Sequence, residues 1–179
     1  AANAPAVADE VGPGAVLVEY GASHEEKAGF LLASREAFQC YIPIDVAAPE
    51  LGRLQERMAV SHPWVSVKPI VADFMHPVLL PPLPTAPVLG FFPGSTIGNL
   101  EPDAARDFLI RARITLGPAA RFLLGADLRK APSLLIPAYD DAAGVTAAFN
   151  RNLLVRLNRE AGADFDPMAF RHEARWNDA

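Results

Sequence analysis

Acidic and amide side chains recur where short apolar runs of the chain end, and side chains of these types can bind a polar ligand. Five such residues lie at or just beyond the ends of apolar runs: Glu19, Asp45, Asp73, Asn99 and Asp127. Apolar runs that alternate with helical patterns predict the strands of a parallel sheet. The carboxyl ends of neighbouring parallel strands meet at one edge, where ligands bind. We therefore expect these five side chains to line a common rim.

Two of these acids suit an adenosine-type ligand. Asp45, at the end of the second predicted strand, can accept hydrogen bonds from both hydroxyls of a ribose. Asp73 can accept from the exocyclic amine of adenine, and the ring of Phe74 can cover a face of the base. Gly21 lets the backbone approach the ligand closely. Either acid alone is equally typical of a helix cap or a turn, so the pair at successive strand ends carries the prediction.

The elements that position this rim alternate along the chain. Strands are predicted over residues 16–20, 39–45, 65–73, 88–92 and 121–127, and a sixth begins within 170–176. Helices are predicted from His24, where Ser23 and Glu26 have the spacing of a capping box, from Pro49, from Pro102, and through Val145 to a stop at Gly162. This order predicts an α/β fold with a doubly wound, mainly parallel sheet, helices on both faces, and an incomplete C-terminal side.

The domain boundaries follow composition. Residues 1–14 are small, polar and interrupted by glycine and proline, which predicts a loose lead-in or a cut end. Residues 15–179 are expected to form one Rossmann-like core. Residues 77–87 are rich in proline, which predicts a loop or an extended connection.

Composition restricts the class of protein. The chain has 179 residues, 51% of them hydrophobic, and a net charge of -5, which predicts a globular domain without the basic stripe of a nucleic-acid binder. No apolar run reaches the length of a membrane span. The single cysteine, Cys40, cannot form an internal disulfide, so a reducing cytoplasm is expected. The four histidines share no metal-ligand spacing, and no metal site is predicted.

The absence of two nucleotide-binding motifs restricts the predicted ligand further. The chain has no phosphate-binding loop of the G-x-x-x-x-G-K-[ST] type, and after Gly21 it lacks the later glycines of the dinucleotide fingerprint. An acidic rim is poorly suited to a pyrophosphate. S-adenosylmethionine carries adenosine at one end and a cationic sulfonium at the other, and it is the cofactor that we predict.

The chain resembles the S-adenosylmethionine-dependent L-histidine Nα-methyltransferases of the ergothioneine pathway. The resemblance covers nearly the whole chain. The matching positions are Glu19-Tyr20-Gly21, Lys27, Asp45, Asp73-Phe74, the G-S-T-I-G-N-L segment at 94–100, the Y-D-D-A-A-G-V-T segment at 139–146, and residues 162–166.

This resemblance implies the roles of particular residues. Gly21, Lys27, Asp45, Asp73 and Phe74 would contact the cofactor, and Asn99 and Tyr139 would contact the amino-acid substrate. The implied reaction is in-line transfer of a methyl group from sulfonium to the α-amine, without a covalent enzyme intermediate. No general base is assigned. The implied partner is a small amino-acid substrate. Separately, the incomplete sheet would expose an edge and apolar surface, so association with a second copy of the chain is expected.

The chain departs from the family in two respects. It has Ser23 where members carry a second glycine, and members extend past both ends of this chain. It therefore resembles a truncated cofactor-binding core, which we expect to bind S-adenosylmethionine weakly and not to methylate histidine by itself.

Other interpretations remain open at this stage. Lys27 also fits a solvated charge, Asn99 a helix cap, and Tyr139 a packing aromatic. For the whole chain, the alternatives are the core of an NAD-dependent oxidoreductase and a non-catalytic fragment that binds a cofactor or a partner.

Overall fold

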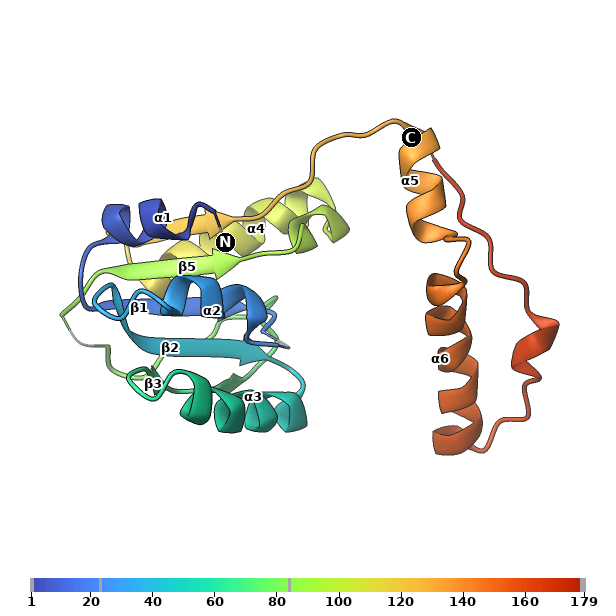
Figure 1. Ribbon diagram of the computed structural model, residues 1–179, viewed down its shortest axis with the longest axis horizontal. Helices are drawn as coiled ribbons and strands as arrows, with labels where there is room; N and C mark the ends of the chain where they lie inside the picture. Colours follow the sequence, from blue (N-terminus) through green and yellow to red (C-terminus); the bar gives the residue numbers. More distant parts are fainter. Residues whose placement is uncertain (1, 23, 84, 178–179) are drawn as a thin grey trace. The chain divides into compact units, whose positions relative to one another are not determined.

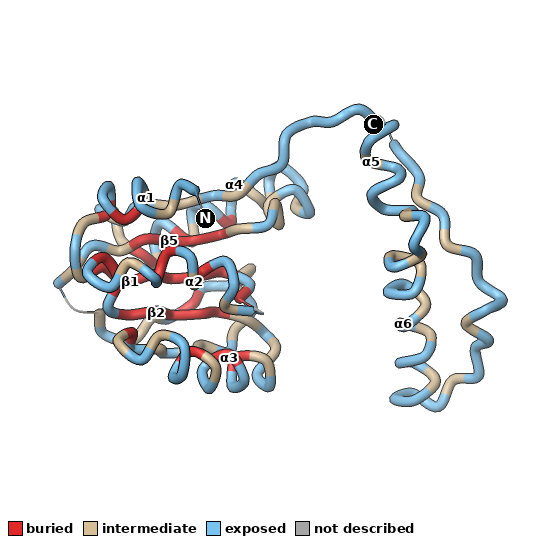
Figure 2. The backbone as a smooth tube through the Cα atoms, viewed as in Figure 1, coloured by how far each residue is buried: buried red, intermediate tan, exposed pale blue. Residues whose placement is uncertain are grey.

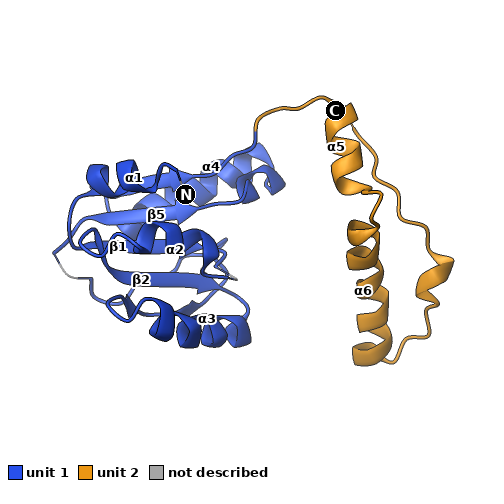
Figure 3. Cartoon of the chain, in the orientation of Figure 1, with its two compact units in different colours: residues 1–127 blue, residues 128–179 orange. Residues whose placement is uncertain are grey.

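The computed structural model describes residues 2–22, 24–83 and 85–177. The chain divides into two compact units, residues 1–127 and 128–179 (Figure 3). The elements of the first unit are α1 (Ala4–Val11), β1 (Ala15–Tyr20), α2 (Glu26–Leu32), β2 (Phe38–Asp45), α3 (Ala48–Ser61), β3 (Ser66–Val67), β4 (Ile70–Val71), β5 (Val88–Phe92), η1 (Thr96–Asn99), α4 (Pro102–Leu116) and β6 (Arg121–Leu124).

The strands of the first unit form one parallel sheet (Figure 1). Their order is β3-β2-β1-β5-β6, and β4 also pairs with β2. The chain runs outward from β1 through β2 to β3 and β4, then returns to the other side of β1 as β5 and β6. This reversal creates a topological switch point between β1 and β5, where ligands bind in such sheets. The predicted doubly wound α/β class is confirmed.

Helices pack on both faces because side chains alternate along each strand. On one face, Ala15 and Leu17 of β1 share a core with buried residues of α1, α2 and α3. On the other face, Val16, Val18 and Tyr20 pack with buried residues of α4. Strands β1, β2 and β5 accordingly form the buried centre of the unit (Figure 2).

The proline-rich segment forms no helix or strand among its described residues, in agreement with the predicted loop. Val78 is buried against the α4 side of the sheet, and Leu80 and Leu83 pack there partly buried. This loop therefore covers part of a sheet face that a helix covers elsewhere.

Three local predictions differ from the structure. Residues 4–11, expected within a loose lead-in, form α1, which buries Ala8 and Val11 in the core. The strand expected over 65–73 is two short strands, β3 and β4, separated at Pro69, which has no N–H to donate. Helix α2 begins at Glu26 rather than His24, and the predicted capping box depends on Ser23, which lies outside the described residues.

The second unit consists of α5 (Pro132–Tyr139), α6 (Val145–Ala161), η2 (Pro167–Ala169) and the segments that join them. Asp141 caps the N-terminal end of α6. Its two carboxylate oxygens accept the backbone N–H groups of Val145 at 2.9 Å and Thr146 at 2.8 Å. These two hydrogen bonds, that of Thr146 first, lower the pKa of Asp141 to about 2. Gly162, with a φ of +66°, ends α6 at the predicted position.

The sixth strand expected within 170–176 is wrong. The described residues 170–177 contain no strand, and this segment is instead tied to α6 by side chains. Arg151 of α6 donates to the carbonyl of Phe170 at 3.1 Å, and Asn150 lies 3.1 Å from the His172 ring. The segment is thus held by side-chain contacts to a helix and not by a ladder. No helix within the described ranges has the length and apolarity needed to cross a membrane.

Candidate functional site

Gly21 forms the turn at the carboxyl end of β1. Its backbone N–H donates to the carbonyl of Ile44 at 2.9 Å, and the N–H of Ala22 donates to the same oxygen at 3.1 Å. The φ of Gly21 is +76°, a conformation that glycine adopts without strain. A Cβ at this position would lie 3.4 Å from the ring of Phe74. The turn therefore brings the ends of β1 and β2 and the ring of Phe74 together.

Asp45 ends β2 beside this turn. Its carbonyl accepts the N–H of Ala72 at 3.0 Å, which fixes the segment after β4 against the end of β2. Its Oδ1 accepts the N–H of Ala47 at 2.8 Å, so the carboxylate also forms the turn that leads into α3. Its Oδ2 has no hydrogen-bond partner among the described residues. Asp45 is half-buried and presents this second oxygen for another donor.

Asp73 forms a similar turn on the neighbouring strand end. Its Oδ1 accepts the N–H of Met75 at 2.8 Å, and its Oδ2 lies 3.5 Å from Nε2 of His76. The side chain is half exposed, so its carboxylate stays accessible at the rim. Both acids therefore combine the turn role with an available position beside Gly21.

Phe74 is held by an aromatic cluster under the rim. Its ring centroid lies 5.6 Å from that of Phe92, 5.7 Å from Phe108 and 6.2 Å from Tyr20, each in an edge-to-face arrangement. Phe92 and Phe108 are fully buried, whereas Phe74 is half-buried. Burial also raises the pKa of Tyr20 to about 12. The cluster supports Phe74 from below and fixes the position of its ring.

Glu19 does not line the open rim as expected, because it is only 2% exposed. Side-chain alternation turns it towards the face covered by α1, α2 and α3, where the hydroxyl of Tyr41 donates to its carboxylate. Burial raises the pKa of Glu19 to about 7, although the hydrogen bond from Tyr41 and the charge of Lys27 oppose this increase. The raised pKa of Tyr41 also results mainly from burial and then from the charge of Glu19.

Lys27 reaches from α2 to the loop after β5. A Cβ at Gly94 would lie 2.8 Å from Nζ of Lys27, so the ammonium occupies space that only glycine leaves free. Gly94 has a φ of +78°, and the next residue, Ser95, has a φ of +60°. Oγ of Ser95 accepts the N–H of Asp127 at 3.0 Å. The side chain of Lys27 therefore extends from α2 to the loop after β5, and this loop is bonded to the segment after β6.

Asn99 is the last residue of η1 and is exposed. Glu101 occupies the N-cap of α4, and no side chain there makes a capping hydrogen bond. The cap that Asn99 could have provided is therefore not formed. Its amide has no hydrogen-bond partner among the described residues and is available to a ligand.

Comparison with known proteins identifies the family. The family model described as "Histidine-specific methyltransferase, SAM-dependent" matches residues 1–179. The chain belongs to this methyltransferase family. It is 44% identical over 165 residues to the histidine N-alpha-methyltransferase of Mycolicibacterium smegmatis and 39% identical over 166 residues to that of Mycobacterium tuberculosis. These matches cover 90% and 91% of this chain.

The chain spans about half the length of these two relatives, 51% of each. Among solved structures, an rRNA methylase from Streptococcus thermophilus is 14% identical with a TM-score of 0.46. That alignment covers 68% of this chain and 66% of the methylase.

The structure places most of the predicted site residues in one unit. Those in the first unit are Gly21, Lys27, Asp45, Asp73, Phe74 and Asn99, all at or near carboxyl ends of the parallel strands. Tyr139 belongs to the second unit, where it ends α5, and its carbonyl lies 2.7 Å from Nε2 of His172. Three further residues near the site were not predicted from the sequence. Tyr41 bonds to Glu19, and Arg57 bonds to Glu25 at the start of α2.

Proposed function

We propose that the chain is the cofactor-binding core of an enzyme that transfers a methyl group from S-adenosylmethionine to the α-amine of L-histidine. The observation that carries this proposal is the family match over residues 1–179. The rim supports it, because Asp45 ends β2, Asp73 follows β4, and the Gly21 turn is bonded to Ile44 and lies against the ring of Phe74. The family match does not favour the alternative of an NAD-dependent oxidoreductase.

The residues at the rim fit the parts of this cofactor. The second oxygen of Asp45 would accept from the ribose hydroxyls, and the accessible carboxylate of Asp73 would accept from the adenine amine. The ring of Phe74 would cover one face of the base. Lys27 would contact the cofactor, as the resemblance to the family implies, and its ammonium could pair with the carboxylate of the methionine part. When bound, the cofactor supplies an electrophilic methyl group on a sulfonium.

The contribution of the protein to the reaction is alignment. Holding two reacting groups at attack distance can contribute about 7–11 kcal/mol to lowering a barrier. The exposed amide of Asn99, on the loop after β5, would orient the substrate near its amino or carboxylate end. The substrate amine must be neutral, because a protonated amine has no lone pair. Tyr139 would contribute a second substrate contact.

Titration calorimetry with S-adenosylmethionine and, separately, with NAD tests the cofactor. We expect S-adenosylmethionine to bind and NAD not to bind. Mass spectrometry of histidine incubated with the protein and cofactor tests methyl transfer, and methylated histidine would contradict the expectation that the chain does not methylate histidine by itself. Binding of NAD without binding of S-adenosylmethionine would overturn the proposal and favour the oxidoreductase alternative.

Gly94→Ala should weaken cofactor binding severalfold, because its Cβ would displace the ammonium of Lys27. Gly14→Ala is the control, since Gly14 has a similar φ of +73° and an added Cβ there would lie no closer than 3.8 Å to a neighbour. Both variants should lose about 1 kcal/mol of folding stability from the strained φ. Urea unfolding measures that loss, and calorimetry measures affinity. Equal affinities of the two variants would contradict the role given to Lys27.

The proposal also includes the setting of the enzyme. We place it in the cytoplasm, because its single cysteine, Cys40, fits a reducing compartment, and in ergothioneine biosynthesis, because of the resemblance to the family. Association with a second copy is supported by the outer surface of α4, where Ile110 is 51% and Ile114 is 76% exposed. Sedimentation of the purified chain tests this association.

A further inference from the structure

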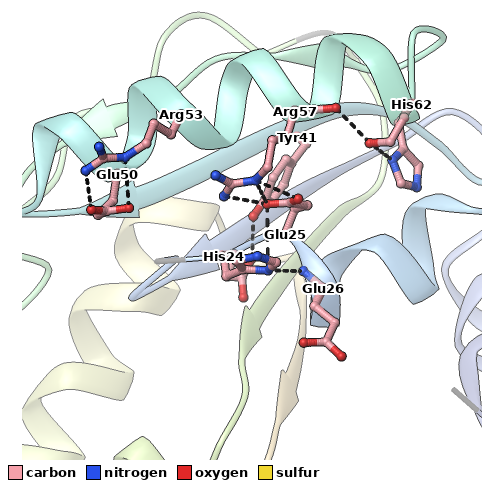
Figure 4. Close-up of polar contacts among 10 residues, drawn as sticks. His24, Glu25, Glu26, Tyr41, Glu50, Arg53, Arg57 and His62 are labelled. Atoms are coloured by element: carbon pink, nitrogen blue, oxygen red, sulfur yellow. Dashed lines mark hydrogen bonds and ion pairs between the residues drawn. The ribbon is translucent and has the colours of Figure 1, made fainter. Parts of the chain in front are cut away.

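An ion pair connects the loop after β1 to α3. Nε of Arg57, on α3, lies 2.8 Å from each carboxylate oxygen of Glu25, and its NH2 lies 2.7 Å from Oε2 (Figure 4). The two residues are 32 positions apart in the sequence. The side chain of Glu25 is only 15% exposed and that of Arg57 is 37% exposed. The hydrogen bond from Arg57 lowers the pKa of Glu25, so the pair stays charged near neutral pH.

A second ion pair on α3 provides the comparison. Arg53 and Glu50 are three residues apart and are 59% and 44% exposed. This pair joins neighbouring turns of one helix, so it can fix no other element, and exposed pairs of this kind contribute little. The Glu25–Arg57 pair instead joins two elements in a partly buried place, where a charged pair that also shares hydrogen bonds is stronger.

The pair acts on the segment that carries two candidate cofactor residues. Glu25 is the N-cap residue of α2, and its carbonyl accepts the N–H of Gly29 at 2.7 Å. Lys27 is in the first turn of the same helix. The other end of the segment is fixed at Gly21 by its hydrogen bond to Ile44. Through Glu25, the side chain of Arg57 on α3 therefore holds the start of α2.

The other partner is connected to the ribose side of the site. Arg57 lies on α3, the helix that follows the turn formed by Asp45 and Ala47. Figure 4 shows Tyr41 beside the pair, and the charge of Glu25 contributes to the raised pKa of Tyr41. The ion pair thus connects the segments that follow β1 and β2.

We propose that Glu25 and Arg57 are positioning residues that hold the first turn of α2 against α3, so that Lys27 and Gly21 keep their places relative to Asp45 before the cofactor binds. The inference rests on the proposed function for its effect on binding. A site that is ordered in advance loses less conformational freedom when the ligand binds. Loss of the pair should therefore weaken cofactor binding although neither residue needs to touch the cofactor.

Amide hydrogen exchange of the ligand-free protein tests the structural part. In Arg57→Gln, residues 24–32 should exchange severalfold faster than in the unmodified chain. Arg53→Gln is the matched control and should leave this segment unchanged. Because no cofactor is present, this measurement is independent of the proposed function. Unchanged exchange in Arg57→Gln would overturn the inference.

Titration calorimetry with S-adenosylmethionine tests the effect on the site. Glu25→Gln and Arg57→Gln should each weaken binding about 5–10-fold, the double variant no more than either one, and Arg53→Gln not at all. Arg57→Lys keeps the charge but loses the forked geometry, so it should fall in between and provides a milder variant if Arg57→Gln does not fold. Additive losses or unchanged affinities would overturn the inference. Failure of the unmodified chain to bind would instead count against the proposed function.

Discussion

The folding stability of the unmodified protein should fall as the pH rises from about 4.5 to about 7, and Glu19→Gln should abolish this fall. In the folded chain burial keeps Glu19 protonated up to about pH 7, whereas in the unfolded chain it loses its proton near 4.5. Within this window, unfolding therefore releases a proton, and stability falls as the pH rises. The difference between the two pKa values corresponds to roughly 3 kcal/mol.

Glutamine is a suitable replacement because its side-chain oxygen still accepts a hydrogen bond from Tyr41 and it does not titrate. Urea unfolding at several pH values from about 5 to about 8 measures the effect, which should appear as a more stable variant at the upper end. Glu26→Gln removes an exposed acid of α2 and is the control, with the pH dependence unchanged. If Glu19→Gln retained the slope of the unmodified protein, the carboxylate of Glu19 would have to be charged in the folded state.

The sheet could be predicted because its strands leave a direct signal in the sequence. The runs that became β1, β2 and β5 are apolar, and each is followed by a polar residue or a turn. The edge of the sheet was less predictable. Pro69 interrupts the run at 65–73, and the effect of one missing donor depends on where the partner strand lies. The run therefore appeared as one strand, although it forms two.

The helices that were missed are short and have weak local signals. The alanine-rich α1 lies between Asn3 and the C-cap residue Gly12, and its eight residues form a marginal helix on their own. Its stability depends on burying Ala8 and Val11 against the sheet, which is a tertiary effect. Helix α5 contains Pro137, a residue that predicts a break. In contrast, α6 was predicted through Val145 to a stop at Gly162, and Asp141 makes two hydrogen bonds that cap its start.

The rim could be predicted from topology, but the support beneath it could not. The ends of parallel strands share one edge, so Asp45 and Asp73 were expected beside Gly21, and the structure places them there. The partner of Glu19 depends on register, because Tyr41 pairs with Leu17, two residues before Glu19. A buried acid needs a donor, and this requirement was the available signal for Tyr41. Arg57 gave no such signal, since its contact with Glu25 depends on how α3 packs.

Asp45→Ala should weaken the binding of S-adenosylmethionine about 10–100-fold, the equivalent of one lost hydrogen bond to a charged group at about 1.5–3 kcal/mol. Asn99→Ala should leave this affinity almost unchanged, because the proposal places Asn99 at the substrate end of the site. Titration calorimetry of both variants under the same conditions measures the difference. Equal losses would contradict the assignment of the two residues to different ends of the ligand.

The turn at Asp45 makes a second variant necessary. Oδ1 of Asp45 accepts the N–H of Ala47, so Asp45→Ala also removes a hydrogen bond that starts α3. Asp45→Asn keeps an acceptor for that N–H, but it removes the charge and replaces the second carboxylate oxygen with an amide group that donates. If the ribose contact determines affinity, Asp45→Asn should lose part of the binding while its unfolding midpoint in urea stays that of the unmodified chain. If instead only the turn matters, Asp45→Asn should bind as tightly as the unmodified chain, and the ribose role of Asp45 would be wrong.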